Sequence, residues 1–118
     1  MLHSSYFEMR GGTITGFNGA KADGAGVYIS SGRFDMYGGT ISYNKASDNA
    51  GGVFVKSGTF NFNGGTISNN TAKWGGGVYS TSTININGGT ISSNTATTQG
   101  GGAFINGGGT ITMSSGWI

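Results

Sequence analysis

The 118-residue sequence contains no cysteine and no proline, and charged residues make up only 8% of it. The lack of cysteine excludes a disulfide framework, Cys-based zinc sites and thiol chemistry. The lack of proline suits strands inside a sheet, where each backbone N–H is needed for a ladder hydrogen bond. The six Lys and Arg and four Asp and Glu residues are scattered, so the net charge of +2 does not indicate a nucleic-acid-binding surface.

All of these charges lie between Glu8 and Lys73, which leaves residues 74 to 118 with none. We expect Ser, Thr and Asn to solvate this half of the surface, and a contact with a partner is the alternative. No apolar run is long enough to span a membrane, and residues 1 to 10 lack the basic start and apolar middle of a signal peptide. Secretion would therefore need a leader outside this sequence.

Glycine, by contrast, is abundant and marks a repeat. The chain has 26 Gly, and GGTI followed by Ser or Thr occurs five times. Around these copies, units of about 26 residues repeat, and such a period is typical of solenoid proteins. The units are residues 7 to 33, 34 to 59, 60 to 83 and 84 to 110, with a partial fifth at 111 to 118.

Each unit contains three short stretches with the two-residue periodicity of a β-strand. In the second unit they contain Phe34 and Met36, then Ile41, then Val53 and Val55. The sequence therefore predicts an all-β fold, a right-handed parallel β-helix with three strands per coil in a triangular solenoid. We expect residues 1 to 118 to form one domain, with four full coils and a partial fifth, and to belong to a longer array.

Two other β architectures compete with this prediction. Asn63-Gly64 and Asn87-Gly88 are strong signals for a tight hairpin turn. The equivalent positions are Arg10-Gly11 and Tyr37-Gly38, which suit that turn poorly although the strand pattern is unchanged. A β-propeller is less suitable still, because its blades need about 40 to 45 residues.

Equivalent residues of successive coils should stack as columns facing the core. An additional column of asparagines, in which each amide bonds the next amide and the local backbone, is expected to be structural. The apolar columns are Phe7/Phe34/Phe60/Ile84/Ile111, Met9/Met36/Phe62/Ile86/Met113, Ile14/Ile41/Ile67/Ile91/Ile118, Ala20/Ala46/Ala72/Ala96 and Val27/Val53/Val78/Ala103, and the polar column is Asn18/Asn44/Asn70/Asn94.

A family resemblance is carried by GGAF at 101 to 104, by GGVY and GGVF in earlier units, and by Phe60-x-x-Asn63. These sequences resemble the GGA-hydrophobic and F-x-x-N repeats of polymorphic outer-membrane and adhesin-like bacterial surface proteins. The resemblance implies a right-handed β-helix at the cell surface, extracellular and non-enzymatic, with a structural or adhesive role. Its partner would be a surface glycan or a protein.

One candidate binding surface is an aromatic stripe at the centre of the third stretch of each unit. If the flanking valines face the core, the aromatic rings face outward in an exposed ladder, which would suit a sugar or a protein contact. The alternative is the reverse, with the rings inside, and Ser80 is the residue that argues for it. The stripe comprises Tyr28, Phe54, Tyr79 and Phe104.

A second candidate surface is formed by hydroxyl residues that flank the inward isoleucines. Its rows resemble the Thr-x-Thr rows of insect antifreeze proteins, so ice binding is an alternative function. Most of the second row is Ser, which lacks the methyl group, and hydroxyl rows also suit any solvated strand. The rows are Thr13/Thr40/Thr66/Thr90 and Thr15/Ser42/Ser68/Ser92.

A third alternative is a degenerate carbohydrate-active helix. Glu8 and Asp35 fall on equivalent outward positions of adjacent coils, about 5 Å apart, a separation typical of retaining glycosidases. Arg10 and Arg33 lie beside them, so we favour a surface ion cluster. The sequence predicts no enzyme activity, cofactor or metal site, and it predicts end-to-end self-association if the ends are uncapped.

Overall fold

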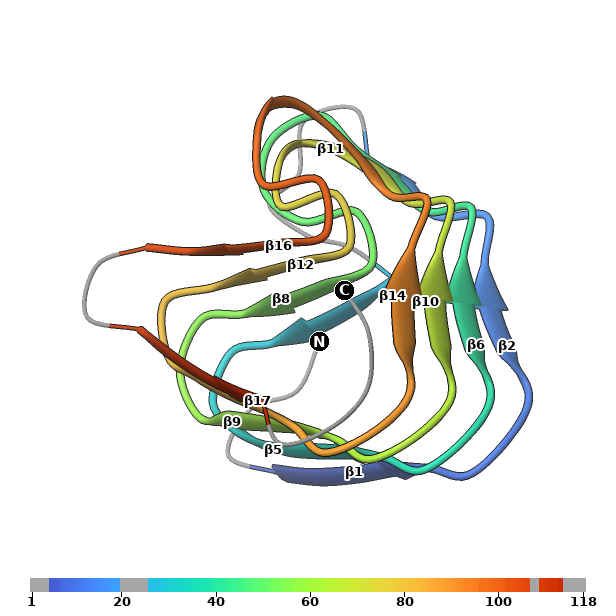
Figure 1. Cartoon of the computed structure of the whole chain (residues 1–118), viewed down its shortest axis with the longest axis vertical. Helices are drawn as coiled ribbons and strands as arrows, with labels where there is room; N and C mark the ends of the chain where they lie inside the picture. The colour runs from blue at the N-terminus through green and yellow to red at the C-terminus, as the bar shows by residue number, and fades with distance from the viewer. Residues whose placement is uncertain (1–4, 20–25, 107–108, 114–118) are drawn as a thin grey trace.

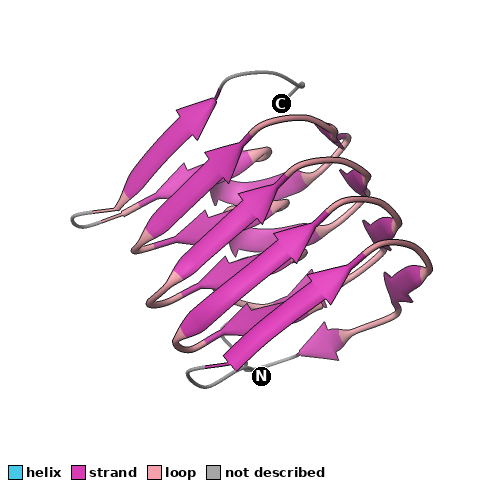
Figure 2. Cartoon of the chain, turned by 90° about the horizontal axis from the view of Figure 1, so that it is seen from below, coloured by secondary structure: helices cyan, strands magenta, loops and turns pink. Residues whose placement is uncertain are grey.

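The computed structural model describes residues 5–19, 26–106 and 109–113 (Figure 1). Parallel β-strands stack into a solenoid of about four turns, and no helix occurs in those ranges. Figure 2 shows the coils stacked, with each strand lying over its copy in the next coil. The prediction of an all-β parallel solenoid is confirmed.

The strands form four sheets, which we number in chain order. The first sheet contains β1 (Ser5–Met9), β5 (Gly32–Met36), β9 (Thr59–Phe62), β13 (Thr83–Ile86) and β17 (Thr110–Met113). The second sheet contains β2 (Thr13–Thr15), β6 (Thr40–Ser42), β10 (Thr66–Ser68) and β14 (Thr90–Ser92). The third sheet contains β3 (Asn18–Gly19), β7 (Lys45–Ala46), β11 (Thr71–Trp74) and β15 (Thr95–Gln99). The fourth sheet contains β4 (Val27–Ile29), β8 (Val53–Val55), β12 (Val78–Ser80) and β16 (Ala103–Ile105).

Four strands per coil replace the three that the sequence predicts. The additional strand is the one in the third sheet, and in β3 and β7 it is only two residues long. A two-residue strand cannot show an alternating pattern, which explains why the periodicity did not predict it. The hairpin alternative is excluded, because β9 pairs with β5 and β13 rather than with β10.

The register of the sheets confirms the predicted core columns within the described residues. Phe34 pairs with Phe7 and with Phe60, and the three rings stack with centroids 4.9 and 5.0 Å apart. Ile41 and Ile67 pair in the second sheet and are fully buried. The assignment of Ala20 to the alanine column was wrong, because Gly19 is the residue that pairs with Ala46, and Ile118 lies outside the described residues. Like residues therefore stack on like along the axis.

The asparagine column is confirmed for three of its four predicted members. The side-chain amides of Asn44, Asn70 and Asn94 donate to backbone carbonyls of the coil before, at 3.0 to 3.1 Å. The assignment of Asn18 was wrong: Asn18 pairs with Lys45, and the backbone N–H of Phe17 is the group that bonds Asn44. The offset to the next coil is the same at Thr15 with Ser42 and at Asn18 with Lys45, so no residue is inserted between them and Phe17 takes the position of Asn44.

The glycine pairs that precede the fourth sheet allow the coils to approach closely. A Cβ atom on Gly77 would lie 2.5 Å from the carbonyl oxygen of Gly102 and 2.9 Å from Nδ2 of Asn94. Both distances are shorter than van der Waals contact. Glycine at this position therefore leaves room for the asparagine column and for the next coil.

Candidate functional site

The aromatic column of the fourth sheet lies on the side of the strand opposite the valines. Val53 and Val78 belong to the main core, whereas Phe54 and Tyr79 belong to a second apolar cluster. The rings of the column stack in sequence, with centroid distances of 4.8 Å for Tyr28 and Phe54, 5.1 Å for Phe54 and Tyr79, and 5.5 Å for Tyr79 and Phe104. The orientation predicted from the sequence is therefore the one the structure shows, and Ser80 is accommodated in the core by accepting a hydrogen bond from the N–H of Ser82 at 2.9 Å.

The prediction that this column is an exposed stripe was wrong for its two central members. Phe54 is 5% exposed and Tyr79 is 7% exposed, while Tyr28 and Phe104 are half-buried. Ala50, from the connection between β7 and β8, and Trp74, at the end of β11, pack against the rings. These contacts turn most of the column into a small second core.

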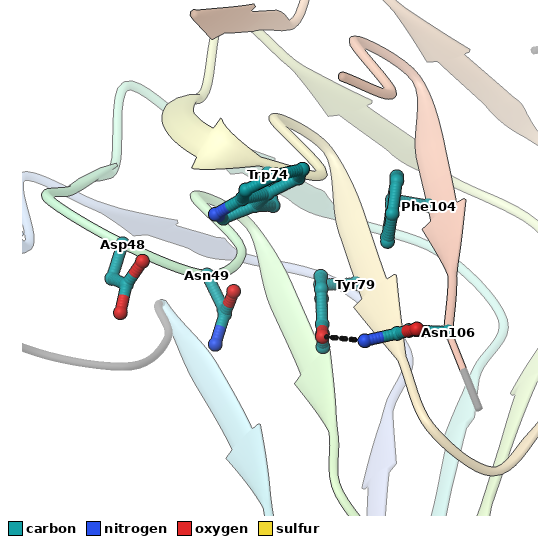
Figure 3. Close-up of a pocket in the computed structure, with 6 residues that line it drawn as sticks. All are labelled: Asp48, Asn49, Trp74, Tyr79, Phe104 and Asn106. Atoms are coloured by element: carbon teal, nitrogen blue, oxygen red, sulfur yellow. Dashed lines mark hydrogen bonds between the residues drawn. The ribbon is translucent and has the colours of Figure 1, made fainter. Parts of the chain in front are cut away.

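A cavity of about 400 Å³ remains beside this second core (Figure 3). Trp74 at the end of β11, Tyr79 in β12 and Phe104 in β16 supply three aromatic rings, and amide and carboxylate groups complete the lining. In Figure 3, Asp48 and Asn49 lie on one side of the aromatic group and Asn106 on the other. The volume is within the range of small-molecule sites, about 300 to 1,000 Å³.

Contacts among the lining residues fix the shape of the cavity. The Trp74 and Phe104 rings lie 5.5 Å apart and are tilted by 59°, while the rings of Tyr79 and Phe104 are nearly parallel at 10°. Nδ2 of Asn106 donates a hydrogen bond to the Tyr79 hydroxyl at 2.9 Å. The backbone N–H of Trp74 donates to the carbonyl oxygen of Asp48 at 3.2 Å. The aromatic and polar walls are therefore held in place by the solenoid itself.

The sequence predicted two members of this site, Tyr79 and Phe104, and missed the other four. No role was predicted for Asp48, Asn49, Trp74 or Asn106. The missed residues lie where the repeat breaks: Trp74 pairs with Gln99 across a register shift in the third sheet. A residue without a like counterpart in the next coil is the signal that could have identified the site.

The predicted hydroxyl rows lie in register on the second sheet, which is seen at the right of Figure 1 as β2, β6, β10 and β14. The first row, Thr13/Thr40/Thr66/Thr90, runs from exposed to half-buried. The second row is uneven, because Thr15 and Ser92 are exposed, Ser68 is half-buried and Ser42 is buried.

The acidic pair of the first sheet forms an ion cluster as predicted, but Asp35 is buried rather than at the surface. Glu8 and Asp35 pair across β1 and β5, Arg10 forms an ion pair with Glu8, and Arg33 lies 3.1 Å from Asp35. The Tyr6 hydroxyl oxygen lies 3.0 Å from an oxygen of each carboxylate, and its single proton can be donated to either one. A hydrogen bond with Arg33 lowers the pKa of Tyr6, but desolvation and the bonds to the two carboxylates outweigh it, so the pKa is raised.

The described residues contain no group of three or more His, Cys, Asp and Glu side chains that could hold a metal ion. Within the same ranges, no helix has the length and apolar character needed to cross a membrane. Comparison of the chain with protein-family models, curated proteins and solved structures gave no match.

Proposed function

We propose that this chain is a non-enzymatic structural and adhesive module of a bacterial cell surface. We further propose that it binds a surface glycan in the cavity lined by Trp74, Tyr79 and Phe104. The cellular setting rests on the resemblance of the GGV(Y/F) and F-x-x-N repeats to adhesin-like proteins. In this proposal the coil is right-handed, as the crossover rule for parallel strands predicts. The cavity replaces the continuous aromatic stripe as the contact site.

The observation that carries the proposal is the combination of rings and planar polar groups around one cavity. Aromatic rings favour the apolar C–H surfaces of a sugar, and Tyr and Trp combine such a surface with a polar group. Amide and carboxylate side chains can bond hydroxyl groups, since Asn offers both donors and acceptors and Asp offers acceptors. Trp74, Asn106 and Asp48 supply these chemistries at one site.

A glycan array with three proteins tests this proposal. We expect the wild-type chain to bind a set of glycans and Trp74→Ala to lose that binding, because Trp74 supplies much of the aromatic wall. Tyr43→Ala is the matched control, since Tyr43 is an aromatic residue that is 68% exposed and does not line the cavity. Circular dichroism should show that both variants stay folded.

Two results would count against the proposal. Equal array signals from wild type and a folded Trp74→Ala variant would place the contact elsewhere. No signal from any of the three proteins would remove the glycan-binding role. Sedimentation of the same samples measures the predicted end-to-end self-association, which needs the sheet edges rather than the cavity.

A further inference from the structure

The lining of the cavity combines aromatic rings with a negatively charged carboxylate. Three aromatic side chains, Trp74, Tyr79 and Phe104, line it, and among the described lining residues Asp48 is the one that carries a formal charge. Aromatic rings attract a cation through their electron-rich faces, by about 0.5 to 2 kcal/mol according to desolvation. The ring of Tyr79 lies between those of Phe54 and Phe104, so Trp74 and Phe104 are the rings that can offer a face. A carboxylate at the same opening adds attraction for positive charge and repulsion for negative charge.

We infer that the ligand group that enters this cavity carries a positively charged nitrogen, either a quaternary ammonium or a protonated amine. This inference rests on the proposed function, because it names the chemistry of the ligand for the same site. An amino sugar and a choline-type headgroup both supply such a group. Acidic sugars are disfavoured, because their carboxylate would meet that of Asp48.

An ammonium group of the protein itself already lies near this aromatic wall. Nζ of Lys73 lies 5.8 Å from the centroid of the Trp74 ring, near the outer limit for a cation–π contact. Lys73 is exposed, so its side chain is screened by solvent. The solvent-screened ammonium of Lys73 therefore repels a second cation in the cavity only weakly.

This arrangement gives opposite expectations for two substitutions. Asp48→Asn removes the attracting charge and should weaken binding of a cationic ligand about threefold to tenfold. Lys73→Gln removes the repelling charge and should strengthen it about twofold to threefold. Glu8→Gln and Arg10→Gln make the same changes of charge in an ion pair beside the first sheet, so neither should alter binding.

Isothermal titration calorimetry with two pairs of probes tests the inference. Choline is compared with its neutral isostere 3,3-dimethylbutan-1-ol, and glucosamine is compared with glucose. We expect at least one cationic probe to bind about tenfold more tightly than its neutral counterpart. Its affinity should fall in Asp48→Asn and rise in Lys73→Gln. Tighter binding of choline identifies a headgroup ligand, and tighter binding of glucosamine identifies an amino sugar.

The contrary outcomes separate this inference from the proposed function. If neutral and cationic probes bind equally, or if no probe binds while the array shows neutral glycans that require Trp74, the inference is overturned and the proposed function stands. If no probe and no array glycan binds, both are overturned. If a cationic probe bound Trp74→Ala as tightly as it binds the wild type, the inference would also be overturned, because the cation would then lie outside the cavity.

Discussion

The side-chain oxygen of Asn70 accepts two hydrogen bonds from Asn44, one from its backbone N–H at 3.0 Å and one from its Nδ2 at 3.1 Å. Asn70 repeats the pattern on Asn94, to which its own N–H and Nδ2 both donate at 3.0 Å. Asn44 and Asn70 are buried. One amide therefore joins three successive coils through a ladder of polar contacts inside the core.

We expect Asn70→Ala to lower the free energy of unfolding by about 3 kcal/mol or more. The substitution leaves two donors of Asn44 and the carbonyl of Ile41 without this partner, and each unsatisfied buried group costs about 1 to 3 kcal/mol. Urea unfolding measures the change. The control is Asn85→Ala, whose amide bonds Asn61 on the partly exposed outer face, and it should cost about 1 kcal/mol. Equal losses for the two variants would contradict a special role for the buried ladder.

Phe54, the buried ring of the aromatic column that does not line the cavity, should contribute to stability rather than directly to binding. Phe54→Ala should cost about 3 to 5 kcal/mol, because Phe54 stacks between Tyr28 and Tyr79 in the second core. Tyr43→Ala removes an exposed ring and should change stability by less than about 0.5 kcal/mol. Thermal unfolding of the two variants measures their stabilities and tests both expectations. A Phe54→Ala variant as stable as the wild type would show that the second core does not hold the coils together.

Glycine should be required at Gly58 and dispensable at Gly11. Gly58 has a φ of 102°, and a Cβ atom there would overlap the backbone of Gly32 in the previous coil. At Gly11 a Cβ atom would meet nothing within 4 Å, and φ is not positive. We expect Gly58→Ala to unfold the chain or to cost more than about 3 kcal/mol, and Gly11→Ala to be neutral or slightly stabilising. Denaturant midpoints of both variants provide the measurement, and similar midpoints would refute the difference in packing.

The second sheet should not produce thermal hysteresis in freezing solutions. Ice binding by regular rows needs methyl and hydroxyl groups at even spacing and exposure, whereas Ser42 is buried and Ser68 is half-buried in the second row. Nanolitre osmometry on the wild type and on Thr66→Tyr measures this property. Hysteresis in the wild type that disappears in Thr66→Tyr would show instead that this face binds ice.

The regular part of the fold could be predicted from the sequence because each coil repeats the same packing. The columns of Phe34 and Ile41 follow from constant spacing, and their register was predicted correctly. The third sheet could not be predicted in this way, because strands as short as β7 contain too few residues to show a period.

The candidate site was harder to predict because it depends on residues that do not repeat. The outward orientation of Tyr79 was predicted from the valines that flank the aromatic residues, against the indication of Ser80, but its burial depends on Trp74, which reaches it from the preceding strand. Asp48 and Asn106 reach the same cavity from coils that are far apart in the sequence. Periodicity reveals the residues that recur in every coil, whereas this cavity depends on residues that do not recur.

The alignment of the backbone hydrogen bonds has a mechanical consequence. In a parallel solenoid the bonds between coils run along the stacking axis, as those between β8 and β12 do. Tension along that axis passes through every coil interface in series, so the coils separate one after another, beginning at the weakest interface. Each released coil of about 26 residues adds roughly 90 Å of extended chain. A surface layer built from such modules would lengthen in steps and absorb a pull that would detach a rigid anchor.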